Sequence, residues 1–198
     1  LKEVTSGVLF QRGGVPHPEG LLSNDIFGIT VKSRKETFAY IDLHGHFFHP
    51  HMYKVVRYMF RNVDKIINGE EFYSINPEGI LVVDKENGQT GIEFLYDNWN
   101  KITWKKSGEN TEESLSVGMR NERSGLIKLC KRDEVFISKL PVEPVFYRDV
   151  KSSSRGGETG DLNRYYTKLI RLTTLLRDRD MFGFQFNSTN YDIQQTIV

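Results

Sequence analysis

The feature that most constrains this chain is a long amphipathic segment, DLNRYYTKLIRLTTLLRDRD, at residues 161–180. Its apolar side chains recur at three- to four-residue spacing and predict one face of a helix: Leu162, Tyr165, Tyr166, Leu169, Leu172, Leu175 and Leu176. Asp161 is placed to cap the first turn. The final NYDIQQTIV starts a second helical pattern, with Ile193 and Ile197 spaced by four. Together they predict a helical hairpin, although an ordinary helix pair in a core fits equally well.

The rest of the chain predicts short strands mixed with helices. The segments are a strand-like pattern at 29–43, a turn at 44–52, an amphipathic helix at 52–67, a strand at 79–84, a helix at 94–106 and extended chain at 133–147. In the first of these we expect Phe38, Tyr40 and Leu43 to face one side. This alternation predicts an α+β fold with small mixed sheets.

Composition narrows the class of protein. The chain has 198 residues, of which 38% are apolar and 27% charged, as in a folded protein of one or two domains. Its net charge of +1 means that any contact with nucleic acid must come from local patches. Cys130 is the single cysteine, which excludes an internal disulfide and a multi-cysteine zinc site. Because the sequence opens with Leu1 and closes inside a helical pattern, we expect a fragment.

A longer pattern covers residues 136–176. It consists of LPV-x-P, an Arg after a short gap, a Gly-Gly loop and DLN-x-x-Y-x-x-x-I. The residues that carry it are Leu140, Pro141, Val142, Pro144, Arg148, Gly156, Gly157, Asp161, Leu162, Asn163, Tyr166 and Ile170. This order resembles one segment of the largest, beta-prime type subunit of multisubunit DNA-dependent RNA polymerases.

Two segments near the N-terminus are similar to motifs of the same subunit. They are GLLSNDIFG at 20–28 and YIDLHGHFFHP at 40–50, where Ile41, Leu43, Phe48 and His49 fall on the matching positions. Between them, TVKSRKETFAY stands where cellular relatives usually carry a cysteine zinc ribbon. The missing ribbon and the short chain suggest the split N-terminal beta-prime chain of a giant (jumbo) bacteriophage polymerase.

The resemblance implies a fragment of the polymerase clamp in four parts. These are an N-terminal clamp head without the zinc ribbon at 1–71, a divergent segment without resemblance at 72–132, a strand and lid loop at 133–160, and truncated clamp coiled-coil helices at 161–198. In the family, the lid lies where nascent RNA leaves the template. The candidate nucleic-acid contacts are Arg148, Lys151, Ser153, Arg155, Gly156 and Gly157. A solvated Ser/Gly linker is the plain alternative.

The helices after the lid are, in the family, the docking site of sigma-like promoter-specificity factors. The candidate docking residues are Arg164, Lys168, Arg171, Arg177 and Asp178. A charged face that only meets solvent is the alternative for each of them.

The resemblance also implies what this chain leaves to others. Polymerase chemistry uses two metal ions held by the aspartates of a NADFDGD motif, which is absent from this sequence. We therefore expect a nucleotidyltransferase subunit with no catalytic residue, metal or cofactor of its own, the Mg²⁺ being held by another chain or segment. The expected partners are beta-type chains, a C-terminal beta-prime chain, a sigma-like factor, template DNA and nascent RNA, without a membrane. The expected location is the cytoplasm of an infected bacterial host.

Two other functions compete with this one. IDLHGH contains D-x-H-x-H, the opening motif of amidohydrolase-like enzymes, so His44 and His46 could share a metal with His49 or His51 nearby. No histidine follows His51, so the ligand set of such a hydrolase is incomplete. The other alternative is a non-enzymatic phage DNA-binding transcription regulator, which would be stable without polymerase partners.

Overall fold

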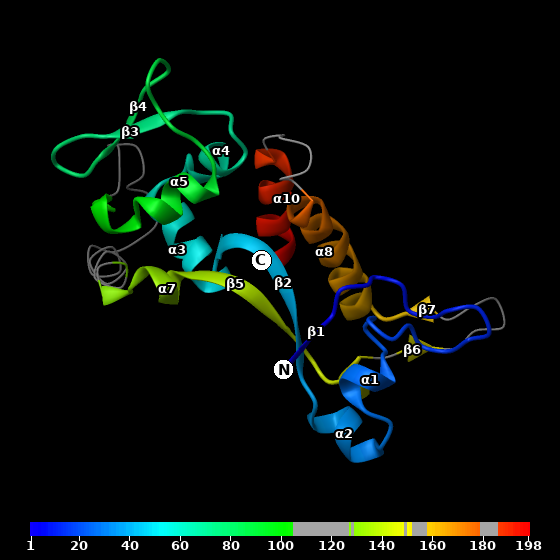
Figure 1. Ribbon diagram of the computed structural model, residues 1–198. Coiled ribbons are helices and arrows are strands. Elements are labelled where there is room, and N and C mark those ends of the chain that lie inside the picture. The colour runs from blue at the N-terminus through cyan, green and yellow to red at the C-terminus, as the bar shows by residue number, and fades with distance from the viewer. Residues whose placement is uncertain (105–126, 128, 149, 152–157, 179–185) are drawn as a thin grey trace. The chain divides into compact units, whose positions relative to one another are not determined.

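The computed structural model describes residues 1–104, 127, 129–148, 150–151, 158–178 and 186–198. Helices and small sheets alternate along them, which confirms a mixed α and β fold (Figure 1). The chain forms two compact units: unit 1 comprises Leu1–His44 and Ser138–Phe184, and unit 2 comprises Gly45–Ile137 and Gln185–Val198.

The elements of unit 1 are β1 (Lys2–Glu3), α1 (Asn24–Phe27), α2 (Val31–Glu36), η3 (Val145–Tyr147), β6 (Val150–Lys151), β7 (Glu158–Thr159) and α8 (Asp161–Arg177). Those of unit 2 are α3 (Pro50–Met59), α4 (Val63–Ile67), β3 (Tyr73–Ile75), β4 (Leu81–Val83), α5 (Ile92–Asp97), η1 (Trp99–Lys101), α7 (Arg132–Val135) and α10 (Asn187–Ile197). Strands β2 (Ala39–Phe48) and β5 (Phe136–Val142) each run from one unit into the other. The strand order is β1-β2-β5, with β1 parallel to β2.

The predicted strand at 29–43 is only partly correct. Residues 31–36 form α2 instead, because Thr30 and Ser33 make a reciprocal capping box at its start. The strand begins at Ala39, and its inward side consists of Ala39, Ile41 and Leu43, each at most 1% exposed. Phe38 is 48% exposed and Leu43 is buried, so the prediction that Phe38, Tyr40 and Leu43 face one side was wrong. Successive side chains of a strand point to opposite faces, and burial selected the odd-numbered set.

The predicted turn at 44–52 is also corrected. β2 continues to Phe48, passing His44 at φ 52, a left-handed conformation that is uncommon for a residue other than glycine. The chain turns only at His49, whose ring nitrogen accepts the His51 N–H at the start of α3. Pro50 takes the first helical position, where its missing N–H costs nothing.

The single helix predicted at 52–67 is two helices. Phe60 is extended (φ −139°, ψ 97°) and separates α3 from α4. Its ring meets Tyr73 and Trp104 edge-on, at centroid distances of 5.5 and 6.5 Å, so aromatic packing holds the break. The predicted end is confirmed, because Gly69 follows α4 with φ 76.

Aromatic side chains build the core of unit 2. The helix predicted at 94–106 is shorter, consisting of α5 and the 3-10 turn η1, and residues 105 and 106 lie outside the described part. The ring centroid of Trp99 lies 5.0 Å from that of Trp104 and 5.6 Å from that of Phe136. Phe48 stacks on Phe136 with ring centroids 4.4 Å apart. The predicted strand at 79–84 is confirmed as β4, which pairs with β3 in an antiparallel hairpin.

The segment predicted as extended at 133–147 contains three elements. α7 precedes β5, and η3 follows it. Pro141 lies inside β5, which is the last strand in the described order, so its missing N–H interrupts no ladder on the outer side.

The strongest predicted helix is confirmed as α8, with two corrections. Asp161 is the first helical residue rather than the cap, since Gly160 occupies the cap position. Leu175 is 50% exposed, whereas Asn163 and Thr173 are buried on the inner face. The second predicted helix is α10, in which Ile193 and Ile197 are buried as expected. Because α8 belongs to unit 1 and α10 to unit 2, the helical hairpin stays a prediction.

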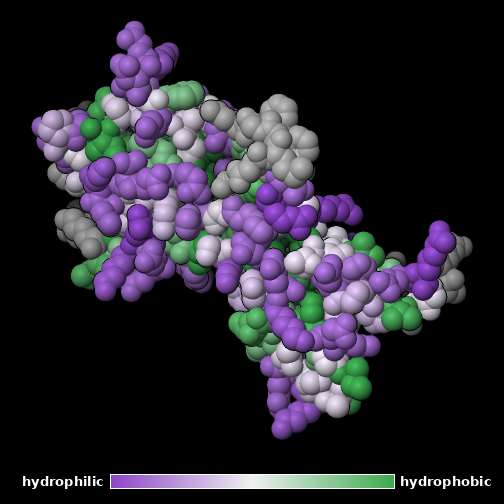
Figure 2. All heavy atoms as spheres, in the orientation of Figure 1, coloured by the Kyte–Doolittle hydropathy of each residue, from purple (hydrophilic) through white to green (hydrophobic). Residues whose placement is uncertain are grey.

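The surface is mostly polar on the face drawn in Figure 2, with apolar side chains between the polar ones. Within the described ranges, no helix combines the length and the apolar character needed to cross a lipid bilayer.

Candidate nucleic-acid interface

The candidate site begins where the chain leaves β5 and turns toward the predicted lid. Two prolines, Pro141 and Pro144, keep this stretch extended until η3 turns it, and Arg148 follows directly. Arg148 is only 2% exposed, which is rare for an arginine and requires that its donors be satisfied inside the protein.

The guanidinium of Arg148 donates hydrogen bonds to groups from three segments. Its Nε donates to the carbonyl of Glu143 at 2.8 Å. Its Nη1 donates to Asn163 Oδ1 at 2.8 Å, and its Nη2 to the Leu21 carbonyl at 2.6 Å. The guanidinium also lies over the Phe27 ring, 4.8 Å from its centroid. Arg148 therefore ties the N-terminal segment, the end of β5 and the start of α8 together.

The charge of Arg148 survives this burial. Removal from water lowers the pKa of Arg148 to about 10, which still leaves it protonated at neutral pH. Because Arg148 is buried and each of its three side-chain nitrogens donates within the protein, the side chain offers little to a phosphate. This finding argues against Arg148 as a nucleic-acid contact and makes it a structural residue of unit 1.

Tyr166 and Asn163 complete the junction from the first turns of α8. The Glu143 N–H donates to the Tyr166 hydroxyl at 3.3 Å, and that hydroxyl donates to the Pro141 carbonyl at 3.4 Å. Burial raises the pKa of Tyr166. The Nδ2 of Asn163 is buried and has no hydrogen-bond partner among the described residues, and the side-chain carbonyl of Asn163 accepts from Arg148. Spaced by three, both side chains lie on the inner face of α8.

The predicted lid follows the junction as the segment between two paired strands. β6 and β7 form an antiparallel pair, with Val150 opposite Thr159 and Lys151 opposite Glu158. Lys151 thus belongs to β6. The other candidate lid residues, Ser153, Arg155, Gly156 and Gly157, lie outside the described residues.

The candidate docking residues on α8 do not share one face. Arg164, Lys168 and Arg171 are exposed and spaced by four and three, which places them on one stripe of the helix. The exposed Leu175 continues this stripe, and Asp178 caps the helix after it. Helical spacing places Arg177 on the opposite side, where its nearest charged neighbour is Asp178 at 3.4 Å.

The stripe of Arg164, Lys168, Arg171 and Leu175, here called the α8 stripe, is mainly cationic. Asp161 is 4.0 Å from Arg164, and both side chains are largely exposed, so this ion pair neutralises little. An exposed cationic stripe around one leucine suits a partner with acidic and apolar side chains.

Two of the four histidines of the alternative metal site have partners of their own, whereas His49 and His51 lie beside each other with ring centroids 5.4 Å apart. His44 Nδ1 lies 3.5 Å from Asp42, while His46 lies 3.4 Å from Glu93 and stacks on Tyr96 with centroids 3.6 Å apart. The left-handed turn at His44 also breaks the alternation on which a shared metal would depend. In the part of the chain that the structure describes, no three histidine, cysteine, aspartate or glutamate side chains converge as metal ligands.

The comparisons with known proteins add no relationship. No protein-family model matches the sequence, and the search of curated proteins found no match either.

Sequence reasoning missed the structural use of Arg148, Asn163 and Tyr166. The signal was present in part, because an asparagine three residues before an aromatic on the inner face of a helix requires a buried partner. That the partner is Arg148, and that Leu21 joins it, is set by contacts between distant segments.

Proposed function

We propose that this chain forms part of the clamp of a multisubunit DNA-directed RNA polymerase, as an N-terminal beta-prime chain. The observation that carries the proposal is the junction at Arg148. Several of the residues that carry the sequence resemblance are joined there by hydrogen bonds.

Three parts of the pattern meet in hydrogen bonds. Pro141 belongs to the LPV-x-P motif, and Asn163 and Tyr166 to the DLN-x-x-Y motif. Leu21, which belongs to the separate GLLSNDIFG motif, accepts from the same Arg148. A chance similarity of short strings gives no reason for its members to bind one another.

The order of elements also suits a clamp. A strand is followed by the antiparallel pair β6 and β7 and then by a helix with one exposed face, in the order expected for a lid followed by docking helices. Residues 152–157 would separate nascent RNA from the template, and the α8 stripe would receive a sigma-like factor.

Exposed apolar side chains of unit 1 support a multichain assembly. Ile29 is 78% exposed and Val31 68%, and Phe146 and Tyr147 are 54% and 60% exposed on η3, which contacts α2. Surfaces of this kind usually meet another protein. Nucleotidyl transfer itself, with its Mg²⁺, would belong to beta-type and C-terminal beta-prime partners in the cytoplasm of an infected bacterium.

Copurification tests the proposal. The full chain, tagged and expressed in its native setting, should isolate a complex that contains a chain with the catalytic aspartate motif and that extends RNA on a DNA template. A chain that purifies alone and binds promoter DNA would replace this function with that of a transcription regulator.

Charge reversal on α8 tests the docking role. Arg164→Glu combined with Arg171→Glu should reduce promoter-dependent initiation about tenfold or more while leaving elongation on a preassembled RNA–DNA scaffold unchanged. Arg177→Glu, on the opposite side of the helix, is the matched control and should leave both activities intact. Equal loss of both activities in the double variant would refute docking at the stripe.

A further inference from the structure

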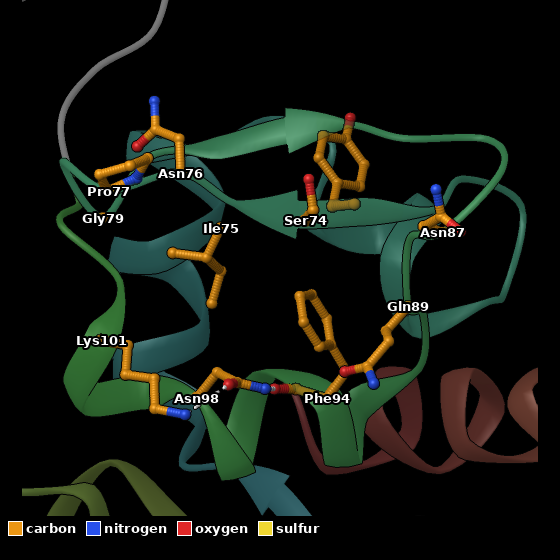
Figure 3. A pocket seen from close by; sticks show the side chains of 11 residues that line it. Ser74, Ile75, Asn76, Pro77, Gly79, Asn87, Gln89, Phe94, Asn98 and Lys101 are labelled. Carbon is orange, nitrogen blue, oxygen red and sulfur yellow. Dashed lines mark hydrogen bonds between the residues drawn. The ribbon is translucent and has the colours of Figure 1, made fainter.

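Unit 2 contains a pocket that none of the foregoing explains. It lies between the β3–β4 hairpin and the α5–η1 segment and has a volume of about 440 Å³ (Figure 3). That is within the range of cavities that hold small molecules. All residues that line it come from Tyr73–Lys101, a segment without any resemblance to the polymerase pattern.

One wall of the pocket is apolar. Ile75 from β3 and Phe94 from α5 point into the space between the hairpin and the helix (Figure 3). The Tyr73 hydroxyl is engaged elsewhere, since it donates to Glu71 and accepts from Asn62. The Phe94 side chain is only 7% exposed, so only part of its ring reaches the pocket, and Ile75 faces it across the gap.

Two exposed polar side chains of the lining, Asn87 and Gln89, are free to bond to a ligand. The side-chain amides of Asn87 and Gln89 make no hydrogen bond within the described part of the chain. Each amide carries both a donor and an acceptor. Asn98 donates to the Phe94 carbonyl, so its own orientation is fixed.

Lys101 provides the charge. It is the one charged residue among those that line the pocket, and its Nζ makes a long 3.4 Å contact to Asn98 Oδ1. No carboxylate of the described residues lies within ion-pairing distance of it. The pocket thus combines an aromatic wall, free amides and an unneutralised cation.

We propose that this pocket binds a nucleotide. The base would lie against Ile75 and the accessible part of Phe94, because every base has a flat face that packs on apolar side chains. The amides of Gln89 and Asn87 would hydrogen-bond its polar edge, as Asn and Gln side chains do with adenine. Lys101 would neutralise the phosphate. The same chemistry would recognise a free nucleotide or the phosphorylated end of a single strand.

Calorimetric titration of the full chain, alone or in the complex from which it purifies, tests this proposal. AMP, GMP, CMP and UMP are the probes, with adenosine and inorganic phosphate as partial ligands. At least one nucleotide should bind saturably, and about tenfold more tightly than either partial ligand, because only the nucleotide reaches both the ring and the lysine. A 5′-phosphorylated oligonucleotide that binds more tightly than AMP would identify a strand end as the source.

Substitutions locate the binding. Lys101→Ala should weaken it about tenfold and Gln89→Ala about threefold, consistent with one charge-assisted and one neutral hydrogen bond. Lys85→Ala, an exposed lysine that does not line the pocket, is the matched control and should change nothing. Circular dichroism checks that each variant folds.

Two results would overturn the proposal: no saturable binding of any nucleotide by the folded chain, or binding that Lys101→Ala leaves unchanged. Neither depends on polymerase partners, so a failure here leaves the proposed function untouched, and the reverse also holds.

Discussion

Each unit of this protein joins segments that are distant in the sequence through one buried polar side chain, but the two side chains differ in charge. In unit 1 the cationic Arg148 bonds Leu21, Glu143 and Asn163. In unit 2 the neutral Gln194, which is fully buried, donates to the Phe48 carbonyl at 3.1 Å and accepts its N–H at 2.8 Å. The amide thus pairs with the last residue of β2 as a neighbouring strand would.

The difference shows what a buried guanidinium and a buried amide each require of the residues around them. A buried guanidinium needs several acceptors and an aromatic face, so its environment involves many positions and leaves an extended sequence pattern. A buried amide needs only one donor and one acceptor, which any backbone supplies. The Arg148 junction therefore carries the resemblance, while the Gln194 contact leaves no recognisable motif.

The largest effect is expected from removing the charged tie. Arg148→Met leaves the Leu21, Glu143 and Asn163 oxygens without their donor and should lower the free energy of unfolding of unit 1 by roughly 3 kcal/mol. Both tryptophans, Trp99 and Trp104, belong to unit 2, so their fluorescence does not report on unit 1. The measurement is instead amide hydrogen exchange of α8, which should accelerate strongly in the variant. Unchanged protection of α8 would show that Arg148 does not hold unit 1 together.

Removing the buried amide of Gln194 should lower the free energy of unfolding by less than removing Arg148. Gln194→Leu leaves the N–H and C=O of Phe48 unpaired and should destabilise unit 2 by about 2 kcal/mol, measured by tryptophan fluorescence in urea. Gln195→Leu is the control from the neighbouring exposed position, where only a bond to the Tyr53 hydroxyl is lost. A larger loss for Gln194→Leu than for Arg148→Met would reverse the ranking.

A rise in pH should lower the stability of unit 2 without any substitution at Arg148 or Gln194. Burial raises the pKa of Tyr73 to about 12, and its bond to Glu71 adds to the effect. Below the ordinary pKa of 10.0 the hydroxyl is protonated in both folded and unfolded chains. As pH rises from there to about 12, only the unfolded chain loses the proton, so the stability of unit 2 falls. Tyr73→Phe should make this decline shallower, and an identical decline in the variant would contradict the assignment.

The smallest effect is expected at the outer side of α8. Leu175→Gln should change the stability of unit 1 by no more than about 0.5 kcal/mol, since half of this side chain is already in water. The measurement is again hydrogen exchange of α8. A substantial loss would mean that the α8 stripe is covered by a neighbour and is unavailable to a partner.

Much of the local structure was predictable. Periodicity and capping residues, which are local signals spanning a few positions, predict five features of the fold. These are the positions of α8 and α10, the start of α3, the strand β4 and the glycine after α4. The wrong predictions share a cause, which is packing against residues distant in the sequence. Phe60 interrupts a continuous helical pattern because its ring packs against two aromatic neighbours. Ala39 rather than Phe38 faces inward because the rest of the fold covers that side of the strand.

The sequence by itself determined where α8, α10 and β4 lie, because hydrogen bonding and side-chain periodicity act over a few residues. It also presented the pattern that includes Arg148. Only the tertiary structure decided that Arg148 is a buried tie rather than a phosphate contact, and that Gln194 meets Phe48 across 146 positions. Contacts over such separations depend on how the whole chain buries its apolar surface, which no local spacing encodes.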